Sequence, residues 1–335
     1  MTSIVIPAHN ESRVIGRLLD ALLAGSPACG TDIVVVCNGC TDDTARVAGE
    51  RGPRVRVVEI PTPSKHTALR VGDEHAKGFP RLYVDADVVL GADGVRALAG
   101  VLAGSPGLLA AAPGRDIPLT GCAWPVRAYY RVWQRLPAVR AGLFGRGVIA
   151  VSEAGHARIA ALPPLMADDL AASLAFAPHE RRVVEAARVV VHPPRTWSDL
   201  IRRRIRAATS SAELERFQEY LRAGRTTPPV RAEERAAGQA ERAEERAGHV
   251  ERAGERADRA DRAGPPRRAG AADPPAPTAR TGAADLRALL RTDPRLLPAV
   301  MVFALAALAA RRGARRAIRE GDFHTWLRDE SSRSS

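Results

Sequence analysis

The stretch Ser-Ile-Val-Ile-Pro-Ala-His-Asn-Glu, residues 3–11, decides the fold of this chain. Its apolar first half predicts a strand over residues 3–7, and helical spacing follows at Val14, Leu18, Leu19, Leu22 and Leu23. Further apolar runs predict strands at 33–36, 55–60, 82–84 and 183–191. Short strands that alternate with amphipathic helices predict an α/β fold with a mostly parallel central sheet and helices on both faces.

Polar residues follow the predicted strands at their carboxyl ends. Residues 9–11 follow the first strand, and Cys-Asn-Gly-Cys-Thr-Asp-Asp, residues 37–43, ends the second. Gly39 permits a turn, and Thr41 or Asp42 can cap the helix that comes next. Open α/β sheets bind ligands at this edge, so two neighbouring polar strand ends predict a pocket. Taken alone, either segment also fits an ordinary strand-to-helix turn.

The fourth predicted strand ends in Tyr-Val-Asp-Ala-Asp, residues 83–87. If the extended strand continued, Asp85 and Asp87 would point to one face of the sheet. Mg²⁺ and Mn²⁺ accept one or two carboxylates and fill their remaining positions with phosphate oxygens and water. The pair is therefore a candidate metal site, and the alternative is a solvated turn after a strand.

Four segments in this order resemble the family 2 glycosyltransferases, which have a Rossmann-like glycosyltransferase A-type fold. They are the opening VIPAHNE, the second turn NGCTDDT, the basic segment PSKHTAL and the DxD at residues 85–87. The resemblance spans residues 3 to about 206. It implies a bacterial enzyme that transfers a sugar from a nucleotide-diphosphate sugar to an acceptor hydroxyl, with inversion and with a metal. The enzyme would be non-processive, because Ala207 replaces the tryptophan of the motif found in processive relatives.

The resemblance also assigns roles to individual residues. Asp87 and Asp85 would hold the metal, and Asp169, in the pair Asp168–Asp169, would deprotonate the acceptor. The nucleotide sugar would be bound by Pro7, Ala8, Asn10, Glu11, Asn38, Lys65, Asp85 and Arg204. Cys37 stands where many relatives have an aspartate that reads the base. Without the resemblance, the acidic pair reads as the first turn of a helix and Arg204 as part of a solvated helix face.

Composition divides the chain into three predicted parts. Residues 1–224 would form the catalytic domain, in which Gly142, Gly145 and Gly147 predict a loop that lies close to another part of the protein. Residues 225–283 consist almost wholly of Arg, Glu, Ala, Gly and Pro, which predicts a disordered or solvated-helical linker. Residues 284–335 would form a C-terminal helical segment.

The C-terminal segment contains an apolar run at 296–310, closed by Arg311, Arg312, Arg315 and Arg316. Its length is below the roughly 20 residues that a membrane-spanning helix needs. Two interpretations remain: a helix packed on the enzyme, or a helix on a membrane surface with arginines that reach the headgroups. We expect a cytoplasmic protein, at most in peripheral contact with the inner face of the membrane.

The four cysteines of this 335-residue chain are typical of reduced thiols. Cys37 and Cys40 form a CxxC without a second pair, so neither zinc nor redox chemistry is predicted. The net charge of +12 comes almost wholly from arginine, which suits phosphate recognition, and no nucleic-acid motif accompanies it.

Other functions fit less of the sequence. A sugar nucleotidyltransferase would carry a glycine-rich basic loop where His9 and Asn10 stand, and a glycoside hydrolase would not need the nucleotide-type strand ends. A non-catalytic basic membrane-binding protein would use the arginines alone. The acceptor stays open among glycan, lipid and small molecule.

Overall fold

The computed structural model describes residues 1–24, 30–162, 168–222 and 282–320. Its contacts divide the chain into two units, Met1–Leu214 with Ala276–Ser335, and Glu215–Pro275. The fold is that of the first unit. Of the predicted linker, residues 225–283, only the last two lie within the described residues, so the predicted domain boundaries and the state of the linker stay predictions.

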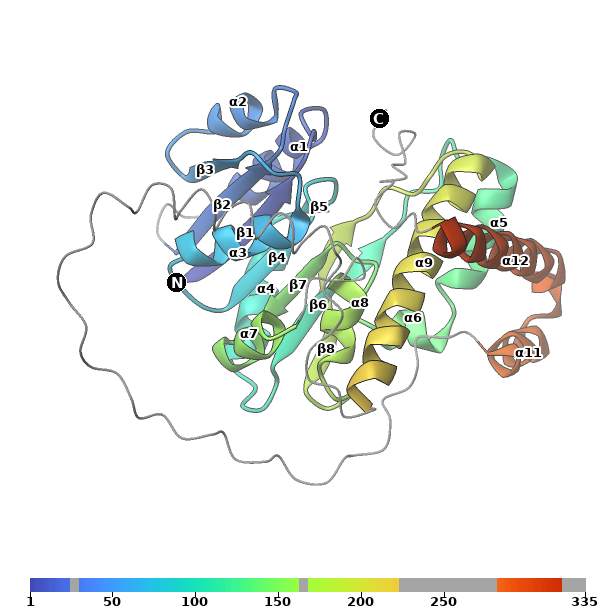
Figure 1. Ribbon diagram of the computed structural model, residues 1–335. Coiled ribbons are helices and arrows are strands. Elements are labelled where there is room, and N and C mark those ends of the chain that lie inside the picture. Colours follow the sequence, from blue (N-terminus) through green and yellow to red (C-terminus); the bar gives the residue numbers. More distant parts are fainter. Residues whose placement is uncertain (25–29, 163–167, 223–281, 321–335) are drawn as a thin grey trace. The chain divides into compact units, whose positions relative to one another are not determined.

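Eight strands of the described residues form one sheet in the order β3-β2-β1-β4-β7-β6-β8-β5 (Figure 1). The predicted strands are confirmed within one or two residues at each end. The strands are β1 Thr2–Ala8, β2 Thr31–Asn38, β3 Val55–Ile60, β4 Arg81–Val84, β5 Val89–Leu90, β6 Ala110–Asp116, β7 Val148–Val151 and β8 Arg181–Val190.

The sheet is mixed, with the parallel strands gathered in its first half. β3, β2, β1 and β4 are all parallel to one another. In the second half, β6 and β8 are parallel, but β7 runs antiparallel to both β4 and β6, and β5 runs antiparallel to β8. The half of the sheet that precedes the DxD is therefore parallel, as expected, whereas the other half is mixed.

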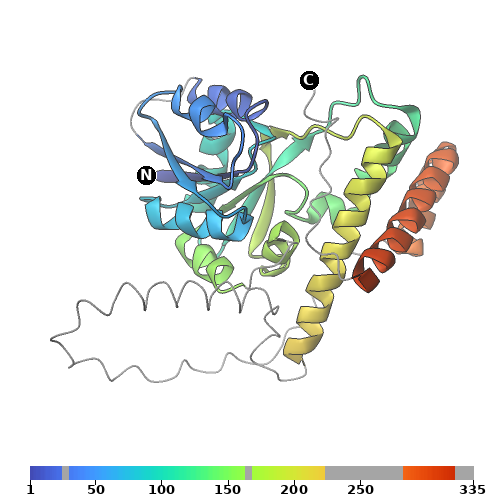
Figure 2. The same ribbon diagram turned by 45° about the horizontal axis from the view of Figure 1, so that its top comes forward.

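Helices cover both faces of the sheet, as predicted (Figures 1 and 2). Ile15 of α1 and Val95 of α4 join one core cluster, whereas Ala68 of α3 packs against Val34 and Val36 on the opposite face. The helices are α1 Ile15–Leu23, α2 Thr44–Gly49, α3 Lys65–His75, α4 Ala92–Ala103, α5 Trp124–Trp133, α6 Pro137–Ala141, α7 Glu153–Ala160, α8 Asp168–Leu174, α9 Trp197–Arg222, α11 Ala283–Thr292 and α12 Leu297–Glu320, with a short 3₁₀ turn η1 at Pro294–Leu296.

The C-terminal helix α12 packs along α5, far from it in sequence (Figure 1). Phe303 stacks on Tyr129 with ring centroids 5.1 Å apart, and Val300 and Ala306 lie in the same buried cluster. Within the described residues one helical stretch, Pro294–Arg319, has the length and the mean hydropathy, 1.6, of a membrane-crossing helix, and 39% of that window is buried in the protein. One face of this helix thus packs on the enzyme, as the first of the two interpretations expected.

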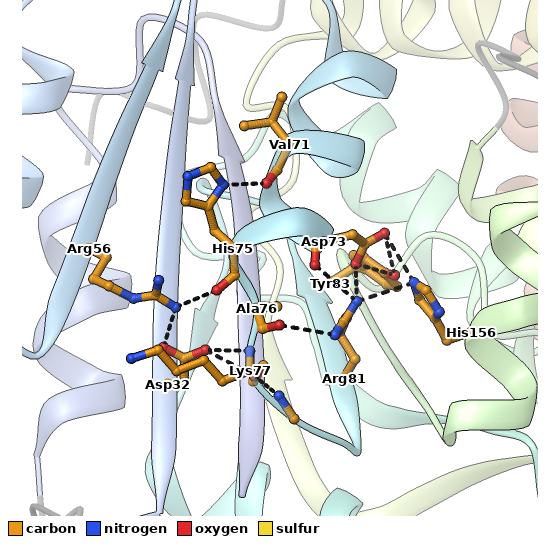
Figure 3. Close-up of polar contacts among 12 residues, drawn as sticks. Asp32, Arg56, Val71, Asp73, His75, Ala76, Lys77, Arg81, Tyr83 and His156 are labelled. Carbon is orange, nitrogen blue, oxygen red and sulfur yellow. Dashed lines mark hydrogen bonds and ion pairs between the residues drawn. The ribbon is translucent and has the colours of Figure 1, made fainter. Parts of the chain in front are cut away.

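Two polar clusters tie the amino ends of the parallel strands together (Figure 3). In the first, the Asp32 carboxylate accepts hydrogen bonds from Ser3 Oγ at 3.0 Å and from Arg56 Nη2 at 2.6 Å. In the second, the Asp73 carboxylate accepts from Arg81 Nη1 and from the Tyr83 hydroxyl, both at 2.8 Å. Ser3, Asp32, Arg56 and Arg81 all stand at the first or second position of their strands, at the edge opposite the predicted pocket.

Candidate nucleotide-sugar site

The sheet changes direction between β1 and β4. The chain runs outward from β1 to β2 and β3, then returns to place β4 on the other side of β1. Pairing of β1 with β4 ends at Val5, whereas its pairing with β2 continues to Ala8, opposite Cys37. In open α/β sheets such a switch point opens a crevice beyond the carboxyl ends of the strands. The predicted residues Pro7 and Ala8 are the last two of β1, and both are buried.

The turns after β1 and β2 are cross-linked by their own side chains. Asn10 adopts a left-handed backbone conformation with φ of 52°, and its Oδ1 accepts a 2.7 Å hydrogen bond from the Thr41 amide. In return, Asn38 Nδ2 donates to the Ala8 carbonyl at 2.8 Å. Asparagine tolerates this backbone conformation better than most residues because its short side chain hydrogen-bonds locally. The structure thus brings the predicted residues Asn10 and Asn38 together.

Glu11 begins the connection to α1 and is joined to the start of α2. Its backbone amide donates to Thr44 Oγ1 at 2.7 Å, and the next amide, that of Ser12, donates to Asp42 Oδ2 at 3.1 Å. Burial would raise the pKa of Asp42, but the hydrogen bonds from Thr44 and Ser12 outweigh it and lower that pKa. The two turns therefore form one rigid rim on this side of the crevice.

The DxD lies in a turn and does not extend the strand. β4 ends at Val84, and the Asp85 amide donates to the Gly147 carbonyl at 2.8 Å. The following residues turn, so that the Val88 amide reaches back to the Asp85 carbonyl at 3.4 Å. The expectation for a continued strand, two carboxylates on one face, is therefore not met at this position.

Lys65, the first residue of α3, pairs with the first carboxylate of the DxD. Its Nζ lies 2.8 Å from Asp85 Oδ1, and both side chains are about one-third exposed, at 32% and 39%. Burial by itself would raise the pKa of Asp85, but Lys65, with Arg206 and Arg203 farther away, holds that pKa below its usual value. The predicted donor contact Lys65 thus lies beside the predicted metal ligand.

Asp87 acts electrostatically on His192. Burial and the charge of Arg17 lower the pKa of His192, and the carboxylate of Asp87 acts against that shift. Asp85 and Asp87 fit a hard cation by chemistry, because each offers carboxylate oxygens and Asp85 is held anionic. Among the described residues no group of three or more His, Cys, Asp or Glu side chains is arranged to hold a metal. A cation here would need further oxygens, such as those of a diphosphate.

The arginines of α9 point in different directions. Arg203 and Arg206, three residues apart, act on Asp85, and Arg203 Nη1 also donates to the His192 carbonyl at 3.4 Å. Arg204, the arginine predicted to bind the donor, instead lies with its guanidinium carbon 5.9 Å from the centre of the Tyr129 ring. Arg203 also acts on Tyr129, so it lies between the two directions, and helical periodicity places positions 203 and 206 close to one another on the helix surface.

The predicted glycine loop lies between the DxD and the predicted base. The Gly145 amide donates a 2.8 Å hydrogen bond to Asp169 Oδ2, and two residues later the Gly147 carbonyl accepts from the Asp85 amide. Both glycines have φ of 64°. Asp169 stands at the start of α8, one residue after Asp168, whose side chain lies outside the described residues. The loop that was expected to approach another part of the protein approaches both acidic motifs.

Two arginines that the sequence analysis did not single out hold this loop. Arg146 is 3% exposed and donates to the carbonyls of Gly142, Pro113, Val139 and Arg140. Arg115 donates to the Gly145 and Val139 carbonyls at 3.3 and 2.5 Å and lies over the Trp133 ring. Burial, with the nearby charge of Arg146, lowers the pKa of Arg115 to about 9. The only sequence signal for a role of Arg115 was its position after the apolar residues of β6.

The CxxC takes part in packing and hydrogen bonding. Cys40 Sγ donates to the Ala8 carbonyl at 3.4 Å and accepts from the Asn10 amide at the same distance. Burial, with the nearby Cys40, raises the pKa of Cys37 to about 12, so its thiol is neutral at physiological pH. Both cysteines belong to the rim between the two turns.

The N-terminal part of the chain is similar to known proteins. Residues 3–135 match the model of the family described as glycosyl transferase family 2. A 4,4'-diaponeurosporenoate glycosyltransferase from Staphylococcus aureus (strain USA300) is 37% identical over 118 residues, 33% of this chain and 31% of that protein. A dolichyl-phosphate beta-glucosyltransferase from Trichomonas vaginalis is 33% identical over 97 residues, 26% of this chain and 29% of that protein. The matches thus span about a third of the length of these curated relatives.

Among solved structures, the mannosyltransferase PcManGT from Pyrobaculum calidifontis, in complex with GDP-Man and Mn²⁺, matches with a TM-score of 0.55. The alignment covers 94% of this chain and 86% of that one at 20% identity. This likeness confirms the predicted glycosyltransferase A-type fold.

Proposed function

Residues 3–135 belong to glycosyl transferase family 2, and from that premise we propose that the chain transfers a sugar from a nucleotide-diphosphate sugar to an acceptor hydroxyl, with inversion and with a divalent metal. One observation carries the proposal. The turns of Asn10 and Asn38, joined by hydrogen bonds, and the Lys65–Asp85 pair follow the carboxyl ends of neighbouring strands, and the loop of Gly145 and Gly147 links Asp85 to the Asp169 carboxylate. The other functions considered require no such arrangement.

The nucleoside would lie against the two cross-linked turns. Pro7 and Ala8 form the buried floor, and Asn10, Glu11 and Asn38 line the rim. Their backbone is already fixed by hydrogen bonds between the turns, so little conformational entropy is lost when a base binds. Cys37, paired with Ala8 in the sheet, would face base-reading positions with a neutral thiol, so this position gives the base no ionic contact.

The diphosphate would lie over Asp85, Lys65 and α9. Asp87 and Asp85 would hold Mg²⁺ or Mn²⁺, and support for a metal comes from PcManGT, whose complex contains Mn²⁺ with GDP-Man. Such a cation counters the charge that develops on the leaving diphosphate. Lys65 now neutralises Asp85 and would turn to a phosphate oxygen when the donor binds. Arg203 and Arg206 face Asp85 and suit the same phosphates better than Arg204, which lies on Tyr129.

Asp169 would accept the proton of the acceptor hydroxyl as the new bond forms. The Gly145 amide fixes one carboxylate oxygen and so helps to set the direction of the group, and the charge of Arg115 lies nearby. Proton transfer to a positioned base speeds such reactions roughly 10²- to 10⁴-fold. A single direct displacement inverts the anomeric carbon. Asp168, its neighbour, would have an auxiliary role, and the reaction would take place in the cytoplasm.

The test is a panel of nucleotide sugars, measured for donor hydrolysis and for thermal stabilisation of the full chain with Mn²⁺, with Mg²⁺ and with EDTA. We expect one nucleotide class to stabilise the protein and to be hydrolysed slowly when metal is present. The variant Asn38→Ala removes the hydrogen bond to Ala8 and should weaken nucleotide binding. If no nucleotide sugar stabilises or is hydrolysed in any metal, the proposed function is wrong.

A further inference from the structure

Helix α12 has an inner and an outer face of different chemistry. Its inner face, including Val300, Phe303 and Ala306, is buried against α5. Its outer face exposes four large apolar side chains, Leu297 at 53%, Met301 at 60%, Leu305 at 59% and Leu308 at 46%. In the described residues only Met1 and Trp124 are other large hydrophobic residues with comparable exposure. Soluble surfaces rarely gather several such side chains in one stripe.

The apolar stripe continues into arginines along the same side of the helix. After Leu308 the spacing of three and four residues leads to Arg312, Arg315 and Arg319, all exposed. At 100° per residue, these positions fall on the side where Leu297, Met301 and Leu305 lie. The outer face of α12, defined as these seven residues, is therefore apolar in its first half, basic in its second, and contains no carboxylate.

We propose that the outer face of α12 docks onto an anionic phospholipid surface. Its apolar half would enter the boundary between headgroups and acyl chains, and its three arginines would bind lipid phosphates. The inference rests on the geometry of one helix and does not depend on sugar transfer.

The packing of the inner face favours a helix that lies on the membrane over one that crosses it. A spanning helix would have to expose or replace the contact of Phe303 with Tyr129, which now stacks at 5.1 Å. The stripe from Leu297 to Leu308 is also only about 17 Å long at 1.5 Å per residue, roughly half of a hydrocarbon core of about 30 Å. The outer face can enter a membrane surface without any loss of packing inside the protein.

Charge argues against a second copy of the chain as the occupant. If two outer faces met in parallel, arginine would face arginine. If they met antiparallel, the arginines of each copy would cover Met301 and Leu305 of the other without a carboxylate to pair with. An anionic lipid surface satisfies the guanidiniums and the apolar side chains at once.

The experiment is flotation of the full-length protein with vesicles of equal parts phosphatidylcholine and phosphatidylglycerol, compared with phosphatidylcholine alone. We expect binding to the anionic vesicles that weakens at high salt. The variant M301E/L305E should lose binding, and R312Q/R315Q/R319Q should weaken it by about fivefold for each arginine. The matched control is R70E on α3, which changes the net charge by the same amount as M301E/L305E and should bind like the wild type. Circular dichroism and a melting curve verify that each variant is folded.

Three outcomes would overturn the proposal. The first is no flotation of the wild type, or equal flotation of the wild type and M301E/L305E. The second is a protein dimer that M301E/L305E dissolves while no vesicle binds, which would make the outer face a protein interface. The third is binding that resists high salt and alkaline carbonate, which would indicate a spanning helix. Donor hydrolysis without vesicles is measured in parallel and reports separately on the proposed function.

Discussion

The Gly145 amide donates a 2.8 Å hydrogen bond to the Oδ2 atom of Asp169. Two residues later in the same loop, Gly147 accepts a hydrogen bond from the Asp85 amide. The proposed base and the proposed metal-binding turn are thus fixed by one short segment. Arg146, which belongs to this segment, anchors it by a hydrogen bond to the Gly142 carbonyl. A displacement of this loop would shift both groups together.

Asp169→Asn should lower turnover by roughly 10²- to 10⁴-fold while the KM for the donor changes little, because the amide keeps the shape of the carboxylate but not its basicity. The measurement is steady-state kinetics with the donor identified by the panel. Asp93→Asn, on the exposed start of α4, is the control and should behave as wild type. If Asp168→Asn proves inactive and Asp169→Asn active, the base is the neighbouring residue.

The stereochemistry of the product tests the same assignment independently. A single displacement with Asp169 as base gives a product with the anomeric configuration opposite to that of the donor. Proton NMR of the first product formed distinguishes the two anomers by their coupling constants. Retention of configuration would rule out direct displacement at this site.

Asp87→Ala should abolish transfer and metal-dependent nucleotide binding and leave the melting temperature nearly unchanged, because its carboxylate would join metal to diphosphate. Calorimetric titration of the nucleoside diphosphate, with Mn²⁺ and with EDTA, measures the loss. Asp20→Asn removes an exposed carboxylate of α1 that pairs with Arg51, and serves as control. Full activity of the wild type in EDTA would contradict a metal role.

Gly147→Ala should destabilise the protein and reduce activity together. The residue has φ of 64°, and an added Cβ would lie 2.4 Å from Val88 Cγ1 and 3.3 Å from Asp85 Oδ2. Gly121 has φ of 77° with nothing within 4 Å, so Gly121→Ala isolates the backbone cost of about 1–2 kcal/mol. Urea unfolding and kinetics of both variants give the comparison. Equal effects of the two substitutions on activity would mean that the close approach to Asp85 has no catalytic consequence.

Asp32 should make the protein sensitive to acid. Burial would raise its pKa, but hydrogen bonds from Arg56, the Lys77 amide and Ser3 outweigh burial and lower it below 3.8. Because the folded pKa is the lower one, the stabilisation is complete above the unfolded value of 3.8 and is lost as the pH falls toward the folded value. Asp32→Asn should cost about 1–3 kcal/mol at neutral pH and flatten the acid limb of the unfolding free energy, measured by urea titration from pH 6 downward. An unchanged acid limb would contradict this.

Deletion of residues 228–280 should barely change the melting temperature of the remaining protein. The proposal that this segment is a linker rests on its composition, because within 231–268 the only large aliphatic residue is Val250. Differential scanning calorimetry of the shortened chain, joined by a Gly/Ser linker of equal length, tests it. A large drop in melting temperature would show that the segment packs on the catalytic domain.

The first half of the sheet could be predicted from the sequence because its strands and turns are encoded by short contiguous segments. The strands β1 to β3 are rich in Val and Ile, β4 contains Leu-Tyr-Val, and the polar turns that follow β1, β2 and β4 are contiguous with them in sequence. Parallel neighbours end at the same edge of a sheet, which predicted a pocket there, and the resemblance assigned Asn10 and Asn38 to it. In the structure their two turns are joined by the Thr41–Asn10 and Asn38–Ala8 hydrogen bonds.

The parts that sequence missed depend on partners far along the chain. Helix α5 gave no clear pattern because Tyr129 packs on Phe303 of α12, after the whole composition break. The DxD leaves the strand only after Asp85, whose amide still bonds to Gly147 in the register of β4 with β7, and the Val88 amide then turns back to the Asp85 carbonyl. Residues 83–87 alone do not predict this turn. Arg204 was grouped with the other arginines of this segment by content, whereas in the structure its guanidinium lies over the Tyr129 ring, and Arg203 and Arg206 act on Asp85.

The two ends of the parallel strands β1 to β4 have different roles. At their amino ends lie two charge clusters, in which Asp32 binds Ser3 and Arg56, and Asp73 binds Arg81 (Figure 3). Their carboxyl ends hold the residues proposed to contact the donor. Substitutions that alter the preference for a base at position 37 or 38 therefore leave the main ionic anchors of these strands untouched. Such a division makes a scaffold evolvable, because new donor specificities can be sampled without first gaining spare stability.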